Sequence, residues 1–106
     1  ASVEMISEVP PLICDSALTK QIVGYMQELP IPGLMPYPGV SANASEDFAS
    51  VAERVPSAFL YLSAGFLDER GDAPAHNPKV RFNEDVCPIG VSCLTHCAIR
   101  WLEENR

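Results

Sequence analysis

Positive charge is scarce in this sequence. Its 106 residues include 7 Lys and Arg against 14 Asp and Glu, which gives a formal net charge of -7. A surface that binds nucleic acid or anionic lipid needs clustered basic side chains, so we expect no nucleic-acid or membrane partner. No apolar run approaches the roughly 20 residues of a membrane-spanning helix. No basic segment followed by an apolar one opens the sequence, as it would in a secretory signal.

Histidine is rarer still, with His76 and His96 as its two occurrences. His76 lies between Pro74 and Pro78, in a loop just ahead of an expected helix. Imidazole is a common metal ligand, and flanking prolines would stiffen the loop that aims it. A catalytic zinc site nevertheless needs at least three protein ligands, and no second histidine is close in sequence. On spacing alone, an incidental histidine in a polar surface loop is the simpler interpretation.

The four cysteines do not have the spacing of a disulfide framework, since Cys87, Cys93 and Cys97 fall near or in one expected helix. Cys93 and Cys97 are four positions apart and share one helical face, so we expect reduced cysteines that pack as small apolar side chains. Reduced cysteines are typical of a cytoplasmic protein, and we expect that location. A small redox or metal-binding protein built on the cysteines is an alternative that the sequence leaves open.

The order of apolar patterns indicates an α/β fold. Hydrophobic residues make up 47% of the chain, enough for a packed core. The patterns predict strands at 2–6 and 58–62, a brief extended segment at 80–82, and helices at 15–29, 45–55 and 83–104. Two strands make too small a sheet for these helices, and the chain does not begin with Met. We therefore expect a chain that is incomplete by itself and takes its other strands from elsewhere.

The segment Ser45-Glu46-Asp47 admits two interpretations. Local physics explains it as a helix start, with Ser45 as the cap and the two carboxylates at the positive end of the helix dipole. A nucleophile or substrate element is the alternative, but no G-x-S-x-G pattern surrounds Ser45.

Several motifs in order resemble one known family. They are PPLICD at 10–15, SEDF at 45–48, VPSAFLYL at 55–62, AHNP at 75–78, FNED at 82–85 and PIG at 88–90. Each is weak singly, but in combination they look like the C-terminal part of a metal-dependent amidohydrolase of peptidase family M-twenty. The nearest branch contains hippurate hydrolase, aminoacylase-like N-acyl-amino-acid amidohydrolases, auxin-conjugate hydrolases and aminobenzoyl-glutamate utilisation proteins.

The resemblance implies a zinc-peptidase-like catalytic α/β domain that carries two divalent metal ions, zinc or manganese. Residues 1–9 would be the last strand of an inserted lid or dimerisation domain, and residues 10–106 the C-terminal part of the catalytic domain. His76 matches the family's last metal ligand. Ser45 and Glu46 would lie beside the substrate, although Ala44 stands where the family more often has glycine.

The activity that the resemblance implies is hydrolysis of the amide bond of an N-acyl or N-aroyl amino acid or a small peptide. The family's other ligands and its general base lie upstream of the matching segment, so we expect no catalytic residue in this chain. By itself the chain would be inactive and would hold no metal. Its partner would be the missing N-terminal part of the enzyme, or a second copy in a homo-oligomer. The alternative is a non-catalytic α/β module that acts through self-assembly or a partner chain.

Overall fold

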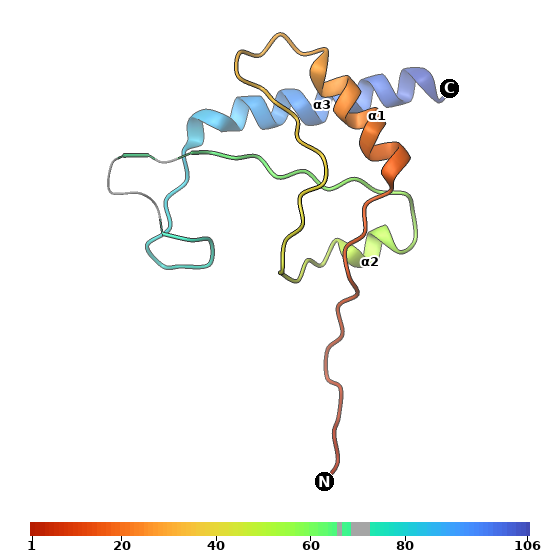
Figure 1. Ribbon diagram of the computed structural model, residues 1–106, viewed down its shortest axis with the longest axis vertical. Coiled ribbons are helices and arrows are strands. Elements are labelled where there is room, and N and C mark those ends of the chain that lie inside the picture. The colour runs from red at the N-terminus through yellow and green to blue at the C-terminus, as the bar shows by residue number, and fades with distance from the viewer. Residues whose placement is uncertain (66, 69–72) are drawn as a thin grey trace. The chain divides into compact units, whose positions relative to one another are not determined.

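The computed structural model describes residues 1–65, 67–68 and 73–106. The chain divides into two compact units, Ala1–Phe59 and Leu60–Arg106. The regular elements of the described residues are all helical (Figure 1): α1 at Ser16–Gln27, α2 at Ala49–Ala52, the 3-10 turn η1 at Glu84–Val86, and α3 at Cys87–Glu104. None of the helices in this described part is long and apolar enough to cross a membrane.

Helix α1 begins where the sequence predicts. Asp15 is its N-cap, and its Oδ1 accepts a hydrogen bond from the backbone N–H of Leu18 at 2.7 Å. This bond satisfies one of the four N–H groups that a helix start leaves without a partner. Tyr25 and Met26 are buried near the end of the helix. The helix ends shortly before Pro30, whose ring would clash with a continuing helix.

Helix α2 is much shorter than the expected helix at 45–55, and the prediction of Ser45 as its cap is wrong. The N-cap is Phe48, without a side-chain hydrogen bond. Glu46 instead accepts from the N–H of Phe48 through Oε1 at 3.1 Å. A single helical turn gains little by itself, and packing usually supplies the free energy to lengthen it. Val51 and Val55 are 44% and 51% exposed, so their packing does not stabilise a longer helix.

The start of the last helix follows the prediction closely. Asn83 caps η1, with its Oδ1 accepting from the N–H of Asp85 at 3.0 Å. Glu84 and Asp85 place negative charge in the first turn, at the positive end of the helix dipole. Pro88 lies in the first turn of α3, where its missing N–H costs nothing.

Helix α3 has two apolar sides. Cys93 and Cys97 are buried at 6% and 5% exposure, which confirms them as core cysteines. Ile99 and Leu102 on the same helix are 50% and 58% exposed. A short chain buries only part of its apolar surface, and this one does not cover an 18-residue helix all round. The uncovered side carries a second apolar stripe, which includes Val91 and Leu94.

The expected strands do not form. The described residues contain helices, turns and irregular segments but no strand, and 2–6, 58–62 and 80–82 are irregular. A strand needs a neighbour for its backbone hydrogen bonds, and an isolated one is not stable in water. The helices of the described residues neither confirm nor contradict the α/β class. The sheet and the domain boundary between residues 9 and 10 stay predictions.

Candidate functional site

His76 lies at the third position of a tight turn. The backbone N–H of Asn77 donates to the carbonyl of Pro74 at 3.2 Å, which closes the four-residue turn. The φ angle of His76 is 67°, and among the described residues it is the one non-glycine residue with a positive φ. A positive φ at the third position is what a type II turn requires, and glycine is the usual residue there. The backbone of this turn therefore favours a residue other than the one it carries.

A second turn follows immediately and has the residues that suit it. Asn77 Oδ1 accepts from the N–H of Lys79 at 2.9 Å, and the Asn77 carbonyl accepts from the N–H of Val80 at 2.9 Å. Pro78, at the second position, has the fixed φ that a type I turn needs. Asn77 thus makes bonds in both turns, and the exposed imidazole of His76 projects from a loop held by its own backbone.

The positive φ of His76 has a cost. For an L-residue the left-handed region is unfavourable by roughly 1–2 kcal/mol, although histidine tolerates it better than most residues. Such conformations persist where the surrounding structure enforces them, and they collect at functional sites. No buried contact explains histidine here, because its side chain is exposed. Packing of the side chain therefore does not explain why histidine occupies this position.

The described residues do not complete a metal site by themselves. No three His, Cys, Asp or Glu side chains among them lie close enough together to hold one ion. An exposed imidazole on a firm turn fits the contribution of one ligand, and metal sites that do chemistry use three or more. In the described part of the chain, His76 is a candidate single ligand that depends on groups from elsewhere.

Ser45 and Glu46, expected beside the substrate, belong to the unit Ala1–Phe59, whereas His76 belongs to Leu60–Arg106. Ser45 is exposed. Glu46 is half-buried, and one of its carboxylate oxygens accepts the bond from Phe48 described above. The fold thus gives Glu46 a local structural role and leaves the hydroxyl of Ser45 accessible. Their place beside a substrate stays a prediction.

The four cysteines are free thiols. Cys14 differs from the buried pair in α3, because its sulfur accepts a hydrogen bond from the N–H of Phe59 at 3.3 Å. This bond and a second one, from the N–H of Asp15 to the carbonyl of Ser57 at 2.8 Å, hold two distant segments together. These roles are structural, and they explain Cys14 and the buried pair without a redox or metal function.

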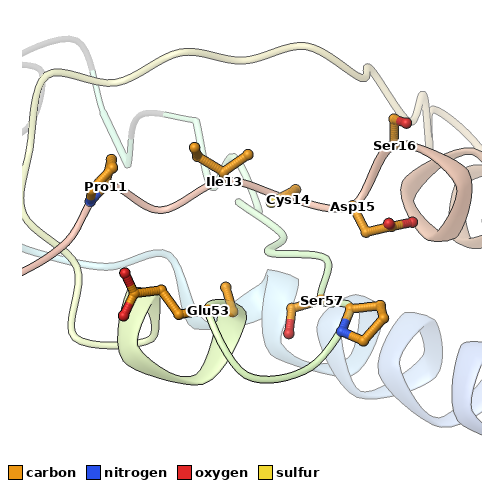
Figure 2. A pocket seen from close by; sticks show the side chains of 9 residues that line it. Pro11, Ile13, Cys14, Asp15, Ser16, Glu53 and Ser57 are labelled. Carbon is orange, nitrogen blue, oxygen red and sulfur yellow. The ribbon is translucent and has the colours of Figure 1, made fainter.

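A groove that the sequence does not predict lies between those two segments (Figure 2). It encloses about 600 Å³ and is lined by Pro11, Ile13, Cys14, Asp15, Ser16, Ala52, Glu53, Pro56 and Ser57. Its most buried polar side chain, Ser57, donates its hydroxyl to the carbonyl of Val55 at 2.9 Å. Asp15 is occupied as the cap of α1. The hydroxyl of Ser57 and the carboxylate of Asp15 are thus already used within the fold.

Comparison with known proteins supplies what the geometry lacks. The sequence matches the model of Peptidase family M20/M25/M40 over residues 1–100. The chain belongs to this family. Its members are hydrolases that generally depend on bound metal ions. The resemblance found in the motifs is thereby confirmed.

One curated relative is the IAA-amino acid hydrolase ILR1-like 2 of Arabidopsis thaliana. It is 42% identical to this chain over 62 residues, which are 58% of this chain and 14% of the relative. The matched region is thus a small part of the length of that protein. No solved structure matches the chain.

Proposed function

We propose that this chain is the C-terminal part of a metal-dependent amidohydrolase that cleaves the amide bond of an N-acyl or N-aroyl amino acid or a small peptide. Three observations support the proposal. The family match covers nearly the whole chain. The plant relative is named as a hydrolase of amino acid conjugates. His76 occupies, with a left-handed backbone, the turn of the AHNP motif, and this last observation carries the assignment to particular atoms.

In this proposal His76 is the ligand that the chain contributes to one of two divalent ions, zinc or manganese. A bound metal of this kind polarises a carbonyl and lowers the pKa of a bound water. The role of this chain is to aim the imidazole. The bonds of Asn77 to Lys79 and Val80, and the fixed φ of Pro78, do so without any contact to the imidazole itself.

Two further parts of the proposal concern the surroundings of this ligand. Ser45 and Glu46 lie beside the substrate, with the exposed hydroxyl of Ser45 free to approach it. In the complete protein, residues 1–9 would pair with other strands and form the last strand of a lid or dimerisation domain. Their apolar side chains are largely exposed in this chain, Val3 at 90% and Ile6 at 91%, as expected for a strand whose neighbours come from elsewhere.

The chain alone is proposed to be inactive. A single imidazole binds a divalent ion weakly, and the described residues bring no second and third ligand to it. The remainder of the polypeptide, or a homo-oligomer, is therefore the proposed partner, and a small N-acyl amino acid or peptide is the proposed substrate.

The test is His76→Ala in the full-length protein that carries this sequence. We expect metal content to fall by about one ion and turnover of an N-acyl amino acid to fall by about three orders of magnitude or more, with the melting temperature nearly unchanged. His96→Gln is the matched control, because it alters the other histidine, within α3. Near-native metal content and turnover in His76→Ala would overturn the assignment.

A second candidate, a non-catalytic module that assembles with itself or a partner chain, is favoured by the uncovered apolar stripe of α3. Val91 and Leu94 are 65% and 63% exposed, and exposed apolar stripes of this kind mark protein contacts. Light scattering of the chain over a dilution series tests it. A monomer at all concentrations that melts cooperatively would speak against self-assembly.

A further inference from the structure

Three contacts on either side of His76 are nested within one another. Leu62 meets Gly90, where a Cβ added to the glycine would lie 3.2 Å from Leu62 Cδ2. Asn83 Nδ2 donates to the carbonyl of Ala64 at 3.4 Å. Innermost, Arg81 Nη1 and Nη2 donate to Asp68 Oδ2 and Oδ1 at 3.1 and 3.4 Å. The chain runs out past the first partner of each pair and returns past the second.

The innermost pair closes the loop that carries His76. Asp68 and Arg81 are 13 positions apart, and His76 lies between them. Loops whose ends are brought together in this way are frequently functional. The guanidinium meets the carboxylate through two N–H donors, the arrangement that fixes both distance and orientation. A loop whose ends are not held together loses more conformational entropy when it adopts one shape.

The partial exposure of this pair sets the size of its effect. The Arg81 and Asp68 side chains are 38% and 34% exposed. Pairs that are open to water contribute little, and dissolved salt screens them. The pair therefore cannot hold the fold of the chain, yet it can bias where the loop places His76.

We propose that Asp68 and Arg81 are positioning residues for His76. Their ion pair closes the loop and thereby raises the affinity of the site that contains His76 for a metal ion. The inference rests on the proposed function, because it requires His76 to be a ligand. It adds that the ligand is presented by charge pairing at the ends of the loop as well as by the turns next to it. The structural basis is the juxtaposition of a two-donor pair at the loop ends with a histidine on a left-handed backbone between them.

The experiment uses the full-length protein and measures the dissociation constant for Zn²⁺ by competition with a chelator. Arg81→Glu and Asp68→Arg are each expected to weaken binding about two- to fivefold, the range that an open ion pair supports. The exchanged pair, Asp68→Arg with Arg81→Glu, is expected to restore it. Arg81→Lys should give an intermediate value, because an ammonium group cannot reproduce the two-donor geometry.

Two readouts separate positioning from mere stability. The affinity for Zn²⁺ should fall when salt is raised from low to molar concentration. The fall should be larger in wild type than in Arg81→Glu, because only wild type has the ion pair that salt screens. In the metal-free protein, amide exchange at Asn77 and Val80 should be faster in the single variants, with an unchanged melting temperature. Arg100→Glu, which breaks the pairs with Glu103 and Glu104 on α3, is the matched control.

The outcomes distinguish this inference from the proposed function. If His76→Ala removes the metal while both single charge variants bind Zn²⁺ as wild type does, the inference fails and the proposed function stands. If the exchanged pair stays as weak as the single variants, the inference also fails. If His76→Ala leaves Zn²⁺ binding unchanged, both fail together.

Discussion

The SEDF segment and the AHNP loop are two short polar motifs that resemble the same family, yet they obey local rules to different degrees. In the first, Glu46 accepts a backbone bond and the chain turns into α2 with ordinary geometry. In the second, His76 occupies a position that suits glycine and contacts no core. Natural sequences depart from local preference mainly where function requires it. The difference therefore supports the proposed ligand role of His76 more strongly than the proposed roles of Ser45 and Glu46.

Replacing His76 by glycine would separate function from folding most sharply. His76→Gly removes the imidazole, so activity and metal content of the full-length protein should fall as far as in His76→Ala. The left-handed backbone destabilises a non-glycine residue by roughly 1–2 kcal/mol, and glycine avoids this strain. Glycine also loses more conformational entropy on folding, which offsets roughly 0.5–1 kcal/mol of the gain. We expect the free energy of unfolding, measured by urea denaturation, to be about 0.5–1 kcal/mol higher for the glycine variant than for the alanine variant. Equal stability of the two variants would argue against strain at this turn.

Asp15 offers the contrasting case of a residue whose role is structural. Asp15→Ala removes the acceptor of the 2.7 Å bond to the N–H of Leu18. We expect a loss of about 1 kcal/mol in the free energy of unfolding, with no direct effect on metal binding. Asp15→Asn is the control and should stay close to wild type, because asparagine caps a helix equally well. A loss in Asp15→Asn as large as in Asp15→Ala would show that charge, and not the cap, stabilises α1.

Gly90 tests the outermost of the nested contacts. Alanine is favoured over glycine within a helix by roughly 1 kcal/mol, but its Cβ would lie 3.2 Å from Leu62 Cδ2. Leu62 is 45% exposed and can move aside, so the higher helix propensity of alanine should outweigh the close approach. We expect Gly90→Ala to raise stability by about 0.5 kcal/mol in urea denaturation. A loss of stability would mean that the approach of Leu62 to α3 is rigid and belongs to the frame of the His76 loop.

The helix ends could be predicted from the sequence because each depends on neighbours in the chain. Asp15, Asn83 and Pro88 act within one turn of their own position, and the first and last helices start where the sequence predicts. The predicted length of the helix at 45–55 was wrong, because the length depends on packing that no local pattern encodes. The strands at 2–6 and 58–62 did not form for a related reason, since a strand depends on a partner that can lie anywhere in the sequence.

The candidate site divides in the same way. Spacing alone favoured an incidental role for His76, and the resemblance to the family reversed that preference. The positive φ of His76 could not be predicted from residue types, because glycine or asparagine is the usual signal for such a turn. The closing pair of Asp68 and Arg81 also left no signal, because nothing local relates residues 13 positions apart. The AHNP motif itself was the one local signal that led to the site.

Ser45→Ala is the smallest expected effect and bears directly on the weaker of the two motifs. Because Ser45 is exposed and does not cap α2, its removal should change the free energy of unfolding by less than about 0.5 kcal/mol. If Ser45 lies beside the substrate, the full-length variant should nevertheless show a raised KM with a normal metal content. An unchanged KM would leave the SEDF segment with the structural role of Glu46 alone. A stability loss near that of Asp15→Ala would instead mean that Ser45 caps a longer helix in the complete protein.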